Sequence, residues 1–353
     1  MNLHLADKVA QAVLYEGYLL YPYRPDTAKN RRRWTFGGLF PPAYCQAHGG
    51  DLSQLQTECL VLGSAATALD LRLRCLHLQA RLVGQLEQPL ERLPKGALPP
   101  YRLVETLRLG KETYTAWQEA VEREVVWPGL SLEELLVQPR RMAFSFPAAE
   151  SVDPLWLPSG AATGVLVRRQ PAVQGAVEIR AAGLGGGVFR LTVSASNLTP
   201  LENSAAMTRD EAALWSLAST HLLLGAHAGG FVSLIDPPEP YAALAADCQQ
   251  TGVWPVLVGT PGERDLLLAA PIILYDYPEI APESPGDLFD GTEIDEILTL
   301  RILTLTEPEK QAMRAADARG RALLDRTEAL PAERLSQLHG AMRNVNPPRR
   351  NHG

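Results

Sequence analysis

The hydrophobic positions in the first half of the chain follow the two-residue period of β-strands. Leucines alternate with Asp70, Arg72 and Arg74, and the alternation then changes phase and continues from Leu76 to Leu82. A change of phase by one residue inside such a run is typical of a β-bulge. Residues 101–117 predict a hairpin around Leu109-Gly110-Lys111. We therefore expect a β-rich domain over residues 1–150.

A segment rich in proline, glycine and serine, residues 147–164, predicts the boundary with a mixed middle domain, residues 151–290. Thr208 and Glu211 have the spacing of a capping box, and the apolar run that follows predicts a helix that ends at Gly229-Gly230. Further on, the strands 253–258 and 264–275 flank a Gly-Thr-Pro-Gly turn that predicts a hairpin. The middle domain is expected to be α+β.

Helical signals dominate the C-terminal part. Thr292 with Asp295, and Thr306 with Glu309, are spaced as helix caps. The pattern predicts a helical segment over 291–345, with helices at 306–326 and 331–345, and a frayed tail over 346–353. The expected fold class is α+β, with a β-rich N-terminal half, a mixed α+β middle and a helical C-terminal segment.

Charge and composition exclude several functions. The 353 residues carry a net charge of −7, with 46% hydrophobic and 21% charged residues. General binding to nucleic acid or to anionic membranes needs a basic surface, so neither is expected. No apolar run approaches the ~20 residues of a membrane span. The N-terminus lacks the basic and apolar regions of a secretory signal, so we expect a cytoplasmic protein.

Cysteine and histidine show no metal-binding spacing. The four cysteines are scattered without a CxxC pair, which predicts buried free thiols. His221 and His227 are six residues apart, and the seven histidines include no HExxH. We therefore predict no cofactor and no resident metal.

The most distinctive segment is acidic. Eight carboxylates fall within the twenty-one residues 276–296, without Lys or Arg. The segment does not match a calcium loop. It is either a site for a cation or a partner, or a solvated loop whose carboxylates cap the helix near Thr292.

A basic block precedes a Trp near the other end of the chain. Residues 24–33 hold five positive charges. The block can stack on bases, face solvent, or pair with the acidic segment. We hypothesise that the two meet, with Arg31, Arg32 or Arg33 paired to Asp276, Glu279 or Asp287. The candidate binding residues are Arg31, Arg32, Arg33, Trp34, Tyr275, Asp276, Tyr277, Glu279, Asp287 and Asp290. No catalytic residue is predicted.

Residues 13–41 and 270–310, with FVSLIDPP at 231–238 and WPVLVG at 254–259, resemble a known group of sequences. They look like a family of bacterial proteins encoded beside the structural and maturation genes of uptake nickel–iron hydrogenases. The resemblance implies an accessory, assembly or maturation role and carries over no catalytic residue. The P-loop, CxxC zinc site and histidine-rich nickel store of known maturation enzymes are not in this sequence.

Two functions are therefore expected from the sequence. The first is a non-catalytic accessory or assembly protein of hydrogenase biogenesis that binds hydrogenase subunits or maturation factors. The second is a metal-dependent or carboxylate-based hydrolase that uses the residues 276–296. An exposed aromatic and apolar patch favours the first, and a raised carboxylate pKa in a closed pocket favours the second.

Overall fold

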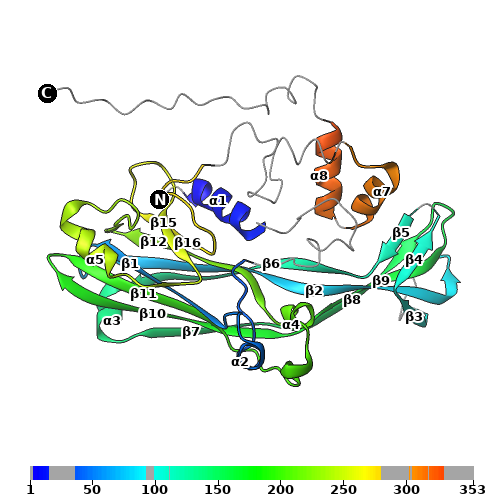
Figure 1. Ribbon diagram of the computed structural model, residues 1–353, viewed down its shortest axis with the longest axis horizontal. Coiled ribbons are helices and arrows are strands. Elements are labelled where there is room, and N and C mark those ends of the chain that lie inside the picture. Colours follow the sequence, from blue (N-terminus) through cyan, green and yellow to red (C-terminus); the bar gives the residue numbers. More distant parts are fainter. Residues whose placement is uncertain are drawn as a thin grey trace.

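The computed structural model describes residues 3–15, 36–92, 99–110, 112–279, 302, 304–316 and 318–329. It is mostly β, with 49% strand and 21% helix, and two antiparallel sheets pack face to face as a sandwich (Figure 1). The α+β class is therefore confirmed in its coarse form, with a larger share of strand than a mixed middle domain implies. None of the helices in this part of the chain is long and apolar enough to cross a membrane.

The six-stranded sheet has the order β13-β1-β11-β10-β7, with β14 also paired to β1. Its strands are β1 (Gln54–Leu62), β7 (Arg140–Phe146), β10 (Val173–Gly185), β11 (Val188–Asn197), β13 (Gly230–Phe231) and β14 (Gln250–Thr251).

The eight-stranded sheet has the order β15-β16-β12-β2-β9-β8, with β3 and β6 also paired to β2. Its strands are β2 (Ala68–Leu90), β3 (Tyr101–Val104), β6 (Trp117–Ser131), β8 (Ala149–Trp156), β9 (Ala162–Gln170), β12 (Leu217–His227), β15 (Trp254–Leu257) and β16 (Leu266–Ala270).

The remaining elements surround the sandwich. Strands β4 (Thr106–Leu109) and β5 (Glu112–Thr115) form the predicted hairpin, with Gly110 at φ +63° in its turn. The described α-helices are α1 (Leu3–Tyr15), α2 (Pro42–His48), α3 (Leu132–Val137), α4 (Arg209–Ala213), α5 (Ala242–Ala246), α7 (Glu307–Ala316) and α8 (Ala318–Glu328), and 3-10 turns span Ser204–Ala206 and Glu239–Tyr241.

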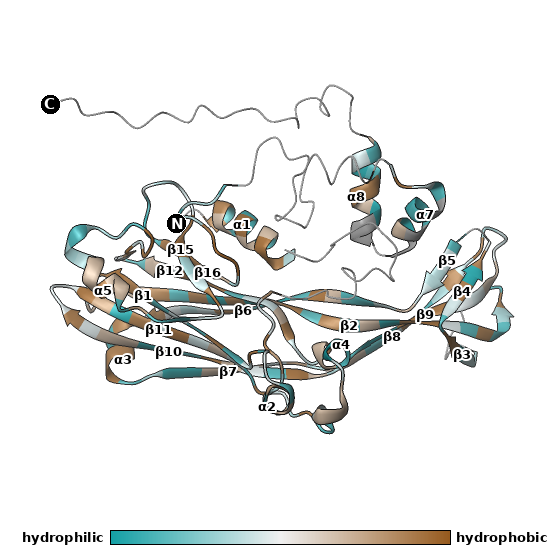
Figure 2. Cartoon of the chain, in the orientation of Figure 1, coloured by the Kyte–Doolittle hydropathy of each residue, from teal (hydrophilic) through white to brown (hydrophobic). Residues whose placement is uncertain are grey.

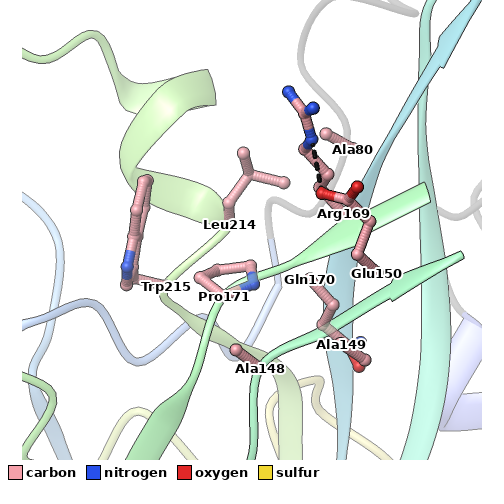
Figure 3. A pocket seen from close by; sticks show the side chains of 9 residues that line it. All are labelled: Ala80, Ala148, Ala149, Glu150, Arg169, Gln170, Pro171, Leu214 and Trp215. Carbon is pink, nitrogen blue, oxygen red and sulfur yellow. Dashed lines mark hydrogen bonds and ion pairs between the residues drawn. The ribbon is translucent and has the colours of Figure 1, made fainter. Parts of the chain in front are cut away.

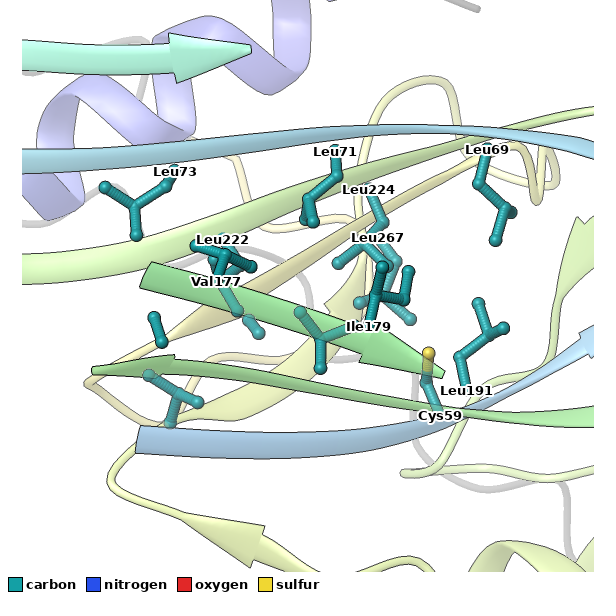
Figure 4. Close-up of a cluster of buried hydrophobic side chains, with 14 of the residues drawn as sticks. Cys59, Leu69, Leu71, Leu73, Val177, Ile179, Leu191, Leu222, Leu224 and Leu267 are labelled. Atoms are coloured by element: carbon teal, nitrogen blue, oxygen red, sulfur yellow. The ribbon is translucent and has the colours of Figure 1, made fainter. Parts of the chain in front are cut away.

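The main core lies between the two sheets. The leucines at 69, 71 and 73 of β2 are fully buried and face Val177 and Ile179 of β10 (Figure 4). Along the long strands, hydrophobic and hydrophilic stretches alternate, as expected where one face is covered more than the other (Figure 2). Each leucine buried here contributes roughly 1.5–3 kcal/mol of hydrophobic stabilisation.

The change of phase in β2 has a different cause from the predicted bulge. The ladder between β2 and β6 is regular from Leu71–Trp127 to Arg81–Trp117. Leu76 and Leu78 are buried because a second cluster, with Tyr15 and Phe40, covers the opposite face of the strand. The irregularity lies on the neighbouring strand β12, between Ala218 and His221, where Ser219 has φ +51°. The prediction of a bulge within β2 at this point is therefore wrong.

The predicted helix after residue 208 is only partly present. Thr208 and Glu211 form the capping box, but the helix ends at Ala213, and residues 217–227 are a strand. That strand lies between β2 and β16. Both of its faces are covered from Leu217 to Ala226, so its sequence lacks the alternation that normally identifies a strand. Tertiary burial overrides the helical pattern here.

The sheets run across the predicted boundary at residue 150. That residue lies inside β8, and β1 pairs with β11 while β2 pairs with β9 and β12. The described residues between 36 and 279 thus build one sandwich, and each of its two sheets contains strands from both predicted domains.

Two sets of helices lie outside the sandwich core. The apolar side of α1 packs with Leu223, Leu266 and Leu268 on the outer face of the eight-stranded sheet. In the C-terminal part, α7 and α8 bury a small cluster that includes Leu323 and Leu324, and the Glu309 carboxylate accepts bonds from the backbone N–H and the hydroxyl of Thr306. The predicted cap at Thr292, the helix at 331–345 and the tail 346–353 lie outside the described residues.

Candidate functional site

The structure describes only part of the predicted site. Tyr275, Asp276, Tyr277 and Glu279 lie on the segment that follows β16. The remaining candidates are outside the described residues, so the pairing of the basic block with the acidic segment stays a prediction. These outside candidates are Arg31, Arg32, Arg33, Trp34, Asp287 and Asp290.

Asp276 has a structural role at the edge of the eight-stranded sheet. Its Oδ1 accepts a hydrogen bond from the backbone N–H of Leu257 at 2.8 Å, and its Oδ2 accepts one from the Ser233 hydroxyl at 2.5 Å. The Ser233 oxygen in turn accepts bonds from two backbone N–H groups, those of Ile235 and Asp236. One carboxylate therefore joins β15 to the loop after β13.

Tyr277 completes the same connection. Its backbone N–H donates to the Leu257 carbonyl at 2.7 Å, and its hydroxyl donates to the Glu263 carbonyl at 2.7 Å. The residue has φ +54°, a conformation that a side chain larger than glycine rarely adopts. The two bonds hold the backbone in this strained conformation.

These contacts cover the free edge of β15. β15 ends the sheet, and Leu257 turns its N–H and C=O away from β16 toward Asp276 and Tyr277. Pro255, two residues earlier, also faces this free edge, and proline has no N–H with which another strand could bond. Exposed strand edges recruit other strands, and this one is protected by proline and by the chain itself.

The segment that makes these contacts also presents apolar side chains to solvent. Ile272 and Leu274 pack against the α1 cluster, while the alternate side chains Ile273 and Tyr275 are 80% and 82% exposed. Ile235, on the loop tied to Asp276, is 49% exposed. We call Ile273 and Tyr275 the 273–275 surface.

The described titratable groups offer little catalytic chemistry. Burial lowers the pKa of His221 to about 4, and burial raises the pKa of the Cys75 thiol to about 12. His221 and His227 are six residues apart along the strand β12, about 20 Å, so they do not share a site, and His227 pairs with Asp70 at 2.8 Å. Among the residues that the structure describes, no group of three His, Cys, Asp or Glu side chains could hold a metal ion.

A polar network anchors α1 and was not predicted from the sequence. Glu122 of β6 accepts bonds from the Tyr15 hydroxyl at 2.5 Å and from Gln11 at 3.0 Å, and Arg74 of β2 lies 3.6 Å from the same carboxylate. Charged residues that alternate with hydrophobic ones along a strand predict a face exposed to solvent. The position of α1 shows that Arg74 is buried, while Glu122 binds the helix and stays partly exposed.

The comparisons with known proteins supply no family for this arrangement. The chain matches no model of a protein family, and no curated protein matches it significantly.

Proposed function

We propose that the protein acts without catalysis, through protein–protein contacts, as an accessory or assembly factor. The observation that carries this proposal is the 273–275 surface, where two large side chains more than three-quarters exposed stand on a segment with a fixed backbone. Exposed apolar side chains on an ordered segment are typical of binding surfaces, because a preordered surface loses little entropy when it binds.

The partner proposed from the sequence resemblance is a hydrogenase subunit or maturation factor, in the cytoplasm. The hydrolase alternative has less support from the described residues. Asp276 is occupied by two structural hydrogen bonds, and Tyr275 is an exposed side chain and not the wall of a closed pocket. No observation in this part of the chain favours hydrolysis.

The test is site-specific photo-crosslinking in the native host. A photoreactive phenylalanine derivative at Tyr275 is expected to capture a hydrogenase subunit or maturation factor, identified by mass spectrometry. The matched control places the same group at Val137 of α3, which is 83% exposed and belongs to a different part of the surface.

Two outcomes separate the parts of the proposal. Capture of an unrelated protein only at position 275 would keep the contact surface and overturn the hydrogenase assignment. Equal capture at 275 and 137, or none at either, would overturn the contact surface itself. Loss of hydrogenase activity in a strain carrying Ile273→Ser and Tyr275→Ser, with Val137→Ser as control, is the functional counterpart.

A further inference from the structure

A groove on the eight-stranded sheet is separate from the 273–275 surface. It has a volume of about 570 Å³ and lies between the end of α4 and the strands β8 and β9 (Figure 3). Ala80 belongs to β2, Leu214 and Trp215 follow α4, and Pro171 follows β9. Ala148 and Ala149, at the start of β8, line the side toward the sheet edge. The volume is in the range of ~300–1,000 Å³ found for ligand sites in proteins.

The chemistry of the groove favours an apolar group. Its polar groups are mostly engaged: Arg169 Nε donates to Glu150 Oε2 at 2.8 Å, and Gln170 is bonded to Arg123 and to the carbonyl of His77. The remaining lining is alanine, proline, leucine and tryptophan. An aliphatic or aromatic side chain can fill this space without leaving a buried polar group unpaired.

The groove adjoins an open strand edge. β8 is the last strand of its sheet, and among the described strands only β9 pairs with it. Pro154, within β8, has no N–H, and proline is accommodated in a strand where that position faces away from the ladder. By alternation, Glu150 and Val152 also turn their backbone N–H and C=O groups outward. The hydrogen bond from Leu157 N–H to the Ala161 carbonyl, in the turn to β9, fits the same alternation.

The charges on this edge are neutralised by the strand behind it. Glu150 pairs with Arg169 at 2.8 Å, and Asp153 pairs with Arg168 at 2.7 Å. Unpaired charges at a strand edge discourage the addition of another strand. Arg168 is shared with Glu119, which also lies 3.5 Å from Arg81, so the three carboxylates of this group are matched by three arginines. Residues 149–153 therefore present their backbone groups to an approaching chain without an excess of charge.

We propose that residues 149–153 and the adjoining groove bind a short extended peptide segment of a partner protein. The segment adds as a strand to the edge of β8, and one of its large apolar side chains passes over Ala148 and Ala149 into the groove beside Trp215. Backbone hydrogen bonds provide general affinity in such complexes, and the side-chain pocket provides selectivity. Pro154 limits the added strand to about five residues, in keeping with a weak and reversible contact.

The experiment selects peptides from a phage-displayed library of random twelve-residue sequences on the full-length chain. Selected peptides are expected to share one large apolar residue within an alternating, β-prone sequence. Ala148→Phe, which fills the groove from an exposed position, should weaken their binding at least about tenfold, equivalent to ~1.4 kcal/mol. Ala66→Phe, at an exposed alanine in another loop, should leave binding unchanged.

Hydrogen exchange distinguishes strand addition from mere occupancy of the groove. Bound peptide should protect the amides of Glu150 and Val152, whereas those of Ser151 and Asp153 are already slow in the free protein. Peptides that bind wild type and Ala148→Phe equally, or that leave Glu150 and Val152 unprotected, overturn the proposal. So does a failure to select any peptide, or self-association through this edge, which would make a second copy the occupant.

Discussion

Asp276 and Leu257 are nineteen residues apart, and the carboxylate of the first accepts a hydrogen bond from the backbone N–H of the second at 2.8 Å. The side chain thus takes the place of a neighbouring strand at the edge of β15. A residue that the sequence marks as a candidate ligand is used to end a sheet.

Replacing Asp276 tests this role. In Asp276→Ala, the Leu257 N–H and the Ser233 hydroxyl lose their acceptor, so the free energy of unfolding should fall by roughly 1–3 kcal/mol. Urea denaturation measures the change. Glu279→Ala, which removes an exposed carboxylate three residues away, is the control and should change stability by less than about 0.5 kcal/mol. Equal effects of the two substitutions would contradict the role given to Asp276.

Ala228 provides a test of backbone strain. It is exposed and has φ +54°, where an alanine is disfavoured by roughly 1–2 kcal/mol. Ala228→Gly should therefore raise the free energy of unfolding, by about 0.5–1 kcal/mol after the greater entropy of glycine in the unfolded chain is counted. Ala66→Gly, at an exposed alanine without positive φ, should be neutral or destabilising. The reverse order of the two variants would show that residue 228 is unstrained.

His221 predicts the pH dependence of stability. Burial lowers its pKa from 6.5 to about 4, so between these values the unfolded chain binds the proton and the folded chain does not. The contribution of this group to the free energy of unfolding should thus be constant above pH 6.5. It should decrease as the pH falls toward 4, by at most about 1.4 kcal/mol per pH unit. His221→Gln should flatten the dependence, whatever its effect at pH 7, while His4→Gln at an exposed site should not. Identical slopes in all three proteins would contradict the assignment.

The thiols should differ sharply in reactivity. Cys59 and Cys75 are fully buried, and burial raises both of their pKa values, so neither forms thiolate at neutral pH. Alkylation at pH 8 followed by mass spectrometry should modify Cys45 and Cys248 slowly in the folded protein and all four thiols in urea. Rapid modification of Cys75 without denaturant would show that the sandwich opens locally.

The local patterns predicted the structure where turn or capping residues mark the ends of an element. The hairpin between β15 and β16 is confirmed, as are the caps at Thr208 and Thr306. Prediction failed at β12, because burial on both faces removes the alternation of a strand. It also failed at Leu76 and Leu78, where the chain changes which face is covered without changing its register.

The candidate site was harder to predict for a related reason. Sequence identifies Tyr275 and Asp276 as unusual but does not separate an exposed side chain from a structural one. That distinction depends on Leu257 and Ser233, which are distant in sequence. The groove beside β8 had no sequence signal at all, because alanine, proline and leucine from four separate segments form it.

The position of α1 has a consequence for synthesis on the ribosome. The helix is made well before the strands that cover it. Val13 packs in a cluster with Leu223 and Leu268, and Leu223 is 210 positions later in the chain. At ~5–20 residues per second, the apolar side of the helix waits roughly 10–40 s for the strands that cover it. During that interval the nascent chain carries an uncovered amphipathic helix, a substrate for chaperones that bind at the ribosomal exit. We expect the dependence of folding yield on such chaperones to decrease when the apolar residues of α1 are replaced by polar ones, even though the finished protein is then less stable.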